Sequence, residues 1–359
     1  MTDRPLKLAF AGANAGRGWA RDAHLAAIRA IPDLEIAAVS ARTQDLAESA
    51  AGVFSAPKAY GDSLEMVRDP AIDIVAVTVK VPEHRAIVLA ALAAGKHVYC
   101  EWPLGRDLAE AEEMAAAARA AGSHSAIGTQ GVLAPAVRHA AKLVREGAIG
   151  TPLNLRVLSP TAGWAAEAPA FYAYLQDKRN GATLSTIAGG HTLAAIEAIV
   201  GAYEDVSAQN SILQREVRIT GTGETVARTC PDHVLAIGRH AGGCVSILEV
   251  FGGTPDVPFK LELRGSAGKL EITGHHPGGF QVGHLDVTAT PAAAPQPAPA
   301  VAGLAGASIN VAEMWTCFVA DIRAGTRTMP GFDDAVRLTR LLDAIDTASD
   351  TGCRVSLKG

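Results

Sequence analysis

The sequence predicts a protein of the α/β class with two domains, a parallel doubly wound domain followed by an α+β domain with a large, mostly antiparallel open sheet. Three observations support this expectation. A chain of 359 residues with 48% hydrophobic residues exceeds one ordinary core. Strands alternate with helical segments from residue 6 to residue 128. Alternating strands joined by turns such as HAGG and GSAG dominate the remainder of the chain.

The composition excludes several classes of protein. The net charge is -5 and no run of Lys or Arg occurs, so the chain offers no electrostatic footprint for a nucleic acid. No stretch of about 18 apolar residues is present, which indicates neither membrane insertion nor export. Five dispersed cysteines without a CxxC pair favour reduced thiols, a cytoplasmic location and no bound metal.

The first elements form a βαβ unit. An apolar strand runs from Leu6 to Gly12, the turn ANAGRG comes next, and WARDAHLAAIRAI is expected to form a helix up to Pro32. The segment LEIAAVS, residues 34–40, supplies the second strand. Because the unpaired N–H groups of such a helix start attract a pyrophosphate, this order is typical of a Rossmann dinucleotide-binding domain.

The turn departs from the usual GxGxxG pattern. Asn14 and Arg17 replace the second and third glycines, while Gly16 and Gly18 are displaced. Taken alone, the turn is equally typical of a plain tight turn, since Gly and Asn both tolerate positive φ. The same alternation then continues through AIDIVAVTV, a helix from Glu83 to Ala94, HVYCE, a helix from Leu108 to Ala121, and SAIG. This continuation favours a cofactor-binding domain over residues 1–128.

The end of the second strand predicts the cofactor. An acidic residue at this point would bind the ribose hydroxyl of NAD, but the strand ends at Ser40 and is followed by Arg42 and Thr43. A guanidinium pairs well with the additional phosphate of NADP. We therefore expect NADP, with NAD also possible, while a solvated loop arginine is the plainer interpretation of Arg42.

Residues 129–359 change in pattern. A helix over VRHAAKLVREG precedes the strands TPLNLRVLS, DHVLAIGRHAGGCVSILEVFGG and FKLELRGSAGKLEI. Residues 288–308 are rich in Ala and Pro, which predicts an extended surface loop. Two C-terminal helices, INVAEMWTCFVADIRAG and FDDAVRLTRLLDAIDTASD, are expected to pack against both domains. The second domain is therefore expected to serve substrate binding and oligomerisation.

These motifs, in this order, resemble the glucose-fructose oxidoreductase, inositol dehydrogenase and MocA (Gfo/Idh/MocA) family across nearly the full chain. The resemblance lies in the βαβ unit, YGDSLEMVRDPAIDIVAVTV, HRAIVLAALAAGKHVYCEWPLG and GATLSTIAGGHTLAAIEAIVG. The turn GANAGRGWA, the EW pair, AGW, GGHT and PDH look most like the branch that contains the fungal galactose-regulon repressor, a catalytically inactive relative that binds a dinucleotide.

The resemblance implies a catalytic site, and several of the family's catalytic residues are replaced in this sequence. The family's Glu-Lys-Pro triplet places a Lys at the reacting oxygen, and here that position is Trp102. The two Asp positions that flank the family's catalytic His are Ile187 and Ala194, so only His191 remains. The cofactor contacts implied by the resemblance are Gly12, Asn14, Gly16, Gly18, Trp19, Ser40, Arg42, Thr43, Val79, His84, Glu101 and Pro103.

Two residues are candidates for proton transfer. His191 follows two glycines at an expected helix start, where a polar residue often satisfies backbone groups, but imidazole suits proton transfer near neutral pH. Lys80 follows the fourth strand, and an exposed loop residue is its simplest interpretation. A desolvated Lys can titrate near neutrality, so Lys80 is also a hypothetical replacement for the missing family Lys.

Five residues are expected to bind substrate. Trp102 precedes Pro103 at a strand end, where its ring suits stacking on a nicotinamide or a sugar and the peptide bond suits a cis conformation. The remaining four lie in a segment without clean periodicity, and packing of its tyrosines under the loop is an equal alternative; they are Trp164, Tyr172, Tyr174 and Lys178.

The leading functional hypothesis is an NADP-preferring oxidoreductase that acts on a sugar, polyol or related hydroxy compound. The loss of the family's Lys and Asp residues leaves a non-catalytic, dinucleotide-sensing regulator as the alternative from another class. An NAD-dependent glycosidase that uses transient oxidation is a third interpretation within the family's range. The open sheet face further predicts a homodimer or homotetramer.

Overall fold

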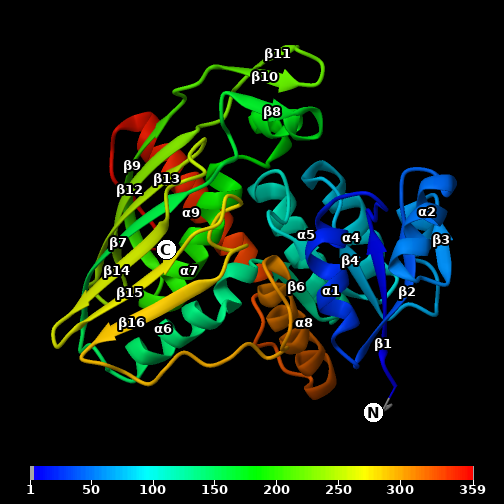
Figure 1. Ribbon diagram of the computed structural model, residues 1–359, viewed down its shortest axis with the longest axis horizontal. Helices are drawn as coiled ribbons and strands as arrows, with labels where there is room; N and C mark the ends of the chain where they lie inside the picture. The colour runs from blue at the N-terminus through cyan, green and yellow to red at the C-terminus, as the bar shows by residue number, and fades with distance from the viewer. Residues whose placement is uncertain (1–3, 359) are drawn as a thin grey trace. The chain divides into compact units, whose positions relative to one another are not determined.

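The computed structural model describes residues 4–358, which divide into two compact units (Figure 1). The first unit comprises the chain up to Gln130 together with Pro299–Arg337, and the second comprises Gly131–Ala298 together with the chain from Leu338 onward. The sequence predicts one boundary at residue 128 and assigns all later residues to the second domain. The structure differs in one segment, because Pro299–Arg337 belongs to the first unit. The returning segment joins the first unit because its helix packs against the helix that follows the first strand.

A six-stranded parallel sheet forms the centre of the first unit, as the sequence predicts. Its order is β3-β2-β1-β4-β5-β6. The strands are β1 (Leu6–Ala11), β2 (Leu34–Ser40), β3 (Lys58–Tyr60), β4 (Ile74–Val77), β5 (His97–Glu101) and β6 (Ser125–Gly128). Strand β4 is buried throughout because helices cover both faces of a parallel sheet. The strand order reverses between β1 and β4, where such sheets bind ligands at their carboxyl ends.

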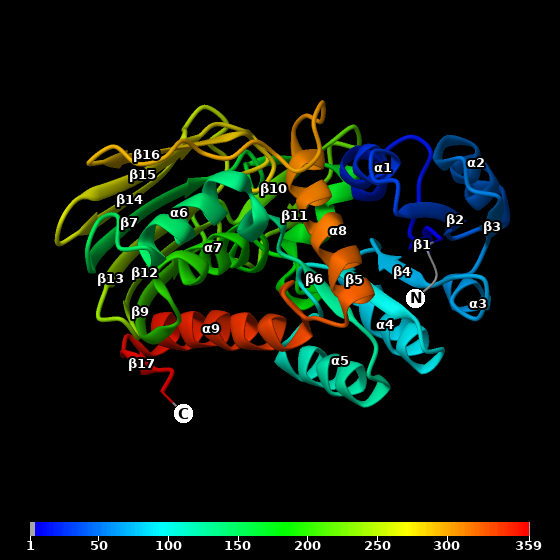
Figure 2. The same cartoon turned by 90° about the horizontal axis from the view of Figure 1, so that it is seen from below.

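Helices cover the two faces of this sheet (Figure 2). They are η1 (Ala20–His24), α1 (Leu25–Arg29), α2 (Gln44–Phe54), α3 (Ser63–Met66), η2 (Val81–Glu83), α4 (His84–Ala93), α5 (Leu108–Ala121), α8 (Ala307–Ala324) and the start of α9 (Phe332–Thr351). Helices α4 and α5 pack together, and α8 packs on η1 and α1. The helix predicted after the glycine-rich turn begins with the π-helical turn η1 and continues as α1. Such π-helical turns are frequent at functional sites.

The second unit contains an eight-stranded, mostly antiparallel sheet, as predicted, in the order β16-β15-β14-β7-β13-β12-β9-β17. The strands are β7 (Pro152–Pro160), β9 (Tyr203–Ser211), β12 (His233–His240), β13 (Val245–Phe251), β14 (Phe259–Gly265), β15 (Lys269–Gly274), β16 (Leu285–Thr290) and β17 (Val355–Ser356). Its helical elements are α6 (Pro135–Arg145), η4 (Ala170–Gln176), η5 (Lys178–Asn180), η6 (Ser185–Gly189) and α7 (Gly190–Val200), and η3 (Gln130–Leu133) begins at the last residue of the first unit.

One face of the eight-stranded sheet is open. Along β13, Ser246, Leu248 and Val250 are buried, whereas Val245 and Ile247 on the alternate face are 44% and 48% exposed. Helices α6 and α7 pack together within this unit, and α6 also contacts β15 and β16 (Figure 1). The alternation confirms the predicted half-buried antiparallel sheet.

A small sheet extends the second unit. It consists of β8 (Glu167–Pro169), β10 (Glu216–Thr220) and β11 (Thr225–Ala227), in the order β11-β10-β8. A buried ion pair braces its base, since Arg228 lies 2.6 Å from Asp232 and the two side chains are 0% and 4% exposed. Arg228 also donates to Gln176 Oε1 at 2.9 Å and to the Ala165 carbonyl oxygen at 2.6 Å. The guanidinium therefore links three segments.

Several smaller expectations can be compared with the structure. The five cysteines, all within the described residues, form no disulfide. Within residues 4–358, we find no helix with the length and apolar character needed to cross a bilayer. The predicted Ala/Pro-rich loop is shorter than 288–308, because β16 extends to Thr290 and α8 begins at Ala307.

Candidate functional site

The carboxyl edge of the parallel sheet brings the predicted cofactor residues of the first unit together. Val77 at the end of β4 pairs with Cys100 of β5. The amide and hydroxyl of Thr78 both donate to the Ala11 carbonyl oxygen, at 2.9 and 2.8 Å. The residues that follow β1, β4 and β5 therefore lie side by side, with Glu101 at one end of the row.

Two glycines give the turn after β1 its shape. Gly12 has φ +96°, and an added Cβ would lie 2.6 Å from Val79 Cγ1. Gly18 has φ +104° and has open space where a Cβ would stand. Only glycine adopts these conformations without strain. The turn therefore passes closely over the end of β4 and leaves room outside.

Side chains within the turn hold its backbone. Asn14 Oδ1 accepts hydrogen bonds from the amides of Gly16 at 2.9 Å and Arg17 at 3.1 Å. The buried Trp19 Nε1 has no hydrogen-bond partner within the described residues. An open glycine turn at a helix start and an unpartnered donor beside it fit a dinucleotide, whose pyrophosphate and sugars accept hydrogen bonds.

The residues after β2 have separate roles. The buried Ser40 hydroxyl lies 2.8 Å from the Ser63 hydroxyl, and the Thr43 hydroxyl caps α2 by accepting from the Leu46 amide. Arg42 is exposed, and no ion pair or hydrogen bond of its guanidinium occurs within residues 4–358. Arg42 is therefore available to bind an anionic group.

A buried hydrogen-bond network that the sequence does not reveal orients Glu101. Glu101 Oε1 accepts from the Tyr99 hydroxyl at 3.0 Å and lies 2.6 Å from His24 Nε2. Trp315 Nε1 donates to His24 Nδ1 at 2.9 Å. An indole N–H can only donate, so neutral His24 carries its proton on Nε2 and donates to Glu101.

Ring packing makes this network rigid. The rings of Tyr99 and Trp315 stack at 4.7 Å, and His24 meets Tyr99 edge-on at 5.3 Å. Tyr99, His24 and Trp315 are all 0% exposed. Burial and the nearby Glu101 charge hold the pKa of Tyr99 well above its usual range, so Tyr99 stays a neutral donor. Trp315 is 291 residues from His24, and no local pattern connects them.

His84 joins the turns that follow β4 and β5. Its Nε2 lies 3.0 Å from the Val79 carbonyl oxygen, and its Nδ1 lies 3.0 Å from that of Pro103. Burial lowers the pKa of His84, while the hydrogen bonds to the backbone carbonyl oxygens oppose this shift. The Trp102–Pro103 peptide is cis and Trp102 is 5% exposed, while Lys80 is exposed at the start of η2.

His191 lies in the second unit at the start of α7, directly after the π-helical turn η6. Its side chain is 4% exposed, and burial lowers its pKa to about 3. Its Nδ1 is buried without a hydrogen-bond partner among the residues described. His191 is therefore neutral at physiological pH, and Ile187 and Ala194 supply no carboxylate at the family's Asp positions.

The other substrate candidates of the second unit gather around η4, a 3₁₀ element, which explains their lack of α-helical periodicity. Trp164 has φ +56° and donates from Nε1 to the Leu175 carbonyl oxygen at 3.3 Å. Tyr172 is 47% exposed, whereas burial raises the pKa of Tyr174 to about 12. Lys178 is exposed at the start of η5.

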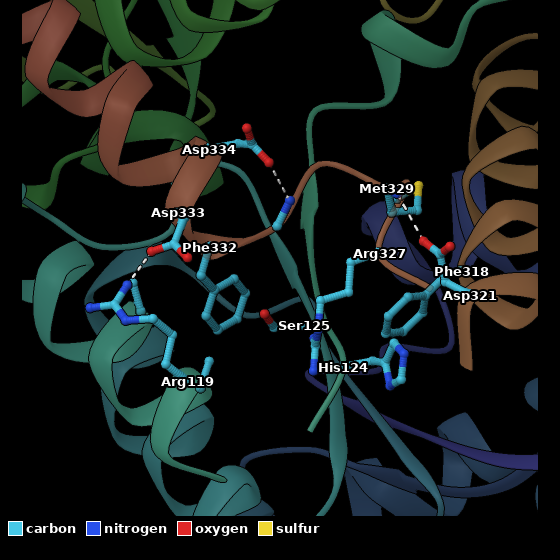
Figure 3. Close-up of a pocket in the computed structure, with 13 residues that line it drawn as sticks. Arg119, His124, Ser125, Phe318, Asp321, Arg327, Met329, Phe332, Asp333 and Asp334 are labelled. Atoms are coloured by element: carbon cyan, nitrogen blue, oxygen red, sulfur yellow. Dashed lines mark hydrogen bonds and ion pairs between the residues drawn. The ribbon is translucent and has the colours of Figure 1, made fainter. Parts of the chain in front are cut away.

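A pocket of about 320 Å³ lies elsewhere in the first unit, beside Ser125 at the opposite end of β6 (Figure 3). Its charged side chains are engaged with one another or with backbone. Arg119 pairs with Asp333, and Asp321 accepts from the amides of Thr328 and Met329 at 2.8 Å. This pocket is therefore distinct from the cofactor edge.

A parallel sheet whose strand order reverses beside a glycine turn at its carboxyl edge is typical of dinucleotide-binding domains. Comparison with known families agrees. Residues 8–129 match the oxidoreductase family with an NAD-binding Rossmann fold (Gfo/Idh/MocA), and residues 135–274 match the C-terminal domain of Gal80p. The two matches agree with the resemblance seen in the sequence, to the Gfo/Idh/MocA family in the first part of the chain and to Gal80p in the second.

The relatives include enzymes and regulators. The chain is 38% identical to dehydrogenase aclE of Aspergillus oryzae over 50% of its length and 49% of that protein, so it spans only about half of this relative. It is 30% identical to the galactose/lactose metabolism regulatory protein GAL80 of Kluyveromyces lactis, over 76% of this chain and 65% of that one. The structure of levoglucosan dehydrogenase in complex with NADH and L-sorbose shares the fold, with a TM-score of 0.84 at 22% identity, covering 98% of this chain and 99% of that one.

Proposed function

We propose that this chain is an NAD(P)-dependent oxidoreductase that transfers hydride between the cofactor and a hydroxyl-bearing carbon of a sugar, polyol or related compound. The observation that carries the proposal is the anchored Glu101 carboxylate beside the glycine turn. Buried hydrogen-bonded networks of this kind fix a charged group in one position, as catalysis requires. The dehydrogenase relative and the sugar complex of the levoglucosan enzyme support it.

The dinucleotide, when bound, supplies the hydride acceptor or donor. The turn from Gly12 to Gly18 holds the pyrophosphate, and Trp19 donates its unpartnered N–H to the cofactor. Arg42 selects NADP by pairing with the 2′-phosphate. The absence of an acidic residue directly after Ser40 supports this preference.

The second unit contributes the substrate side of the proposal. Trp164, Tyr172, Tyr174 and Lys178 are the substrate-binding candidates of the second unit. Trp102 is the candidate of the first unit, where its ring suits stacking. His191 and Lys80 are the proton-transfer candidates carried over from the sequence.

A non-catalytic regulator that senses a dinucleotide is the second candidate function. The Gal80p-like domain and the substitutions at Trp102, Ile187 and Ala194 favour it. Such a protein would bind the cofactor and a protein partner without oxidising a sugar. The free cysteines are compatible with a cytoplasmic protein of either kind.

The test is nicotinamide absorbance over time with NADP and NAD, against aldoses, uronic acids and inositols. Turnover in the wild type supports the oxidoreductase. Cofactor binding without turnover on the whole panel supports the regulator. Lys80→Met and His191→Ala then report on the two proton-transfer candidates, since loss of turnover with cofactor binding retained is expected of a proton-transfer group.

The open face of the eight-stranded sheet supports self-association as a further part of the proposal. Ile237 on β12 and Ile247 on β13 lie directly opposite each other, and they are 54% and 48% exposed. Neighbouring β7 and β14 place Arg156 beside Glu262. An apolar centre with mixed charges beside it suits a second copy of the same face, which predicts a homodimer or homotetramer.

A further inference from the structure

Oxidation of a hydroxyl compound needs a group that takes the hydroxyl proton. Trp102 stands at the family's Lys position, and an indole carries no basic nitrogen. Ile187 and Ala194 stand at the family's two Asp positions around His191, so no carboxylate supports His191 there. The carboxyl edge of the parallel sheet holds another group with the required chemistry.

The two oxygens of Glu101 have different environments. Oε1 receives the hydrogen bonds of His24 and Tyr99. Oε2 accepts no hydrogen bond from the residues that the structure describes, and an added Cβ at Gly128 would stand 2.7 Å from it. The glycine therefore keeps the space around Oε2 open. The side chain is 13% exposed, so one oxygen is anchored and the other can accept a proton.

The hydrogen bond from Trp315 fixes which ring nitrogen of His24 carries the proton. Trp315 donates to His24 Nδ1, which leaves the imidazole proton on Nε2, facing Glu101. The two donors on Oε1 hold the carboxylate in one orientation. Because all three supporting side chains are buried, reorientation of the carboxylate would break several packed contacts.

We propose that Glu101 is the catalytic proton acceptor, and that His24, Tyr99 and Trp315 are its positioning residues. The inference rests on the proposed oxidoreductase function. The substrate's O–H bond breaks and its proton forms a new O–H bond with Oε2. The electron pair left on oxygen becomes the second bond of the carbonyl, while the hydride on carbon goes to NAD(P)⁺, the oxidant. Glu101 then returns the proton to solvent through its exposed side.

The titratable groups around Glu101 are few. His24 faces it from η1, Tyr99 and Cys100 from β5, and His84 from the start of α4. Burial and Glu101 hold the pKa values of Tyr99 and Cys100 well above their usual ranges, so both stay neutral at physiological pH. Gly128 of β6 and Trp315 of α8 carry no charge.

The first variant is Glu101→Gln, which keeps the shape and removes the basic oxygen. We expect kcat to fall by about 10²–10⁴-fold, the usual contribution of a general base. Because the resemblance also implies a cofactor contact for Glu101, the dissociation constant for the cofactor, measured by calorimetry without substrate, should rise by a much smaller factor than kcat falls. Glu48→Gln on α2, an exposed position, is the matched control. A retained kcat, or a large rise in the cofactor dissociation constant with kcat kept at saturation, overturns the proposal.

The second variant is Trp315→Phe, which removes the donor to His24 Nδ1 and retains an aromatic ring. We expect the acidic limb of the kcat profile to move to higher pH, because His24 Nδ1 loses its donor and the imidazole proton is no longer fixed on Nε2, facing Glu101. In the free protein, the midpoint of the pH titration of the Glu101 carboxyl-carbon NMR signal should also move to higher pH. The spectrum of Glu101→Gln identifies this signal, because the signal is absent there. Tyr99→Phe should act alike and is the smaller change. If the NMR titration midpoint and the acidic limb of the kcat profile are the same in the variants as in the wild type, the positioning roles are refuted.

These readouts separate the role of Glu101 from the proposed activity. A wild type without turnover on any substrate refutes the oxidoreductase, whereas the NMR titration of the free protein still tests the network. A wild type with turnover that Glu101→Gln leaves unchanged refutes only the role of Glu101.

Discussion

Acidification from pH 7 to pH 5 should destabilise the protein by about 2 kcal/mol through His191 alone. The folded pKa of His191 is about 3 because the side chain is buried, whereas an unfolded His titrates near about 6.5. Between these values the unfolded chain binds a proton that the folded chain does not. Stability is therefore full above about pH 6.5 and declines as the pH falls toward 3. From the unfolded pKa of about 6.5 down to pH 5 is about 1.5 pH units, and each unit lowers the free energy of unfolding by about 1.36 kcal/mol.

The perturbation that isolates this effect is His191→Gln, which retains a polar side chain and removes the titration. Urea unfolding, followed by tryptophan fluorescence at pH 7 and pH 5, gives the loss of stability for each protein. We expect the variant to lose about 2 kcal/mol less than the wild type. Other buried histidines contribute to both proteins and cancel in this difference. An equal loss in the two proteins would refute the buried, neutral state assigned to His191.

Three further outcomes are expected. Arg42→Ala should weaken NADP binding by about 10–100-fold, the value of a charge-assisted hydrogen bond, and leave NAD binding within about threefold in calorimetry; an equal effect on both cofactors would contradict the assigned preference. Ile237→Asp combined with Ile247→Asp should convert the oligomer to a monomer in light scattering after size exclusion, and an unchanged mass, or a monomeric wild type, would rule out this interface. Asp232→Asn should lower the free energy of unfolding, measured in urea, by about 3–5 kcal/mol, because it leaves the charge of Arg228 buried without its counter-ion. A loss below about 1 kcal/mol, the value of an exposed pair, would show that this ion pair does not stabilise the second unit.

The parallel sheet could be predicted because its strands are apolar runs that end in recognisable turns. Helix starts such as Asp107 before α5, whose carboxylate accepts from the Glu110 amide at 2.9 Å, have local signals that a sequence displays. The antiparallel sheet was predictable for the same reason, since alternation along β13 is visible in its letters. Local periodicity thus carried most of the fold.

The supporting half of the candidate site was not predictable. His24 resembles any polar residue in an amphipathic helix until Trp315 of α8 is placed beside it. The π-helical turn that holds His24 has no sequence signature, and Trp164 adopts a positive φ that a bulky residue rarely shows. These features follow from tertiary packing, which overrides local preference.

The return of Pro299–Arg337 to the first unit has a consequence for how the chain is made. A ribosome releases β1 to β6 long before α8, because about half of the chain lies between these elements. During that time η1 and Tyr99 of the nascent first unit stay uncovered on the side that α8 later occupies. Long-range contacts of this kind slow folding and lengthen the exposure of apolar surface. An expression fragment that ends near residue 130 would keep that surface exposed permanently. Part of the second unit, Gly131–Ala298, thus interrupts the first, and the first unit is completed only when the chain returns to it.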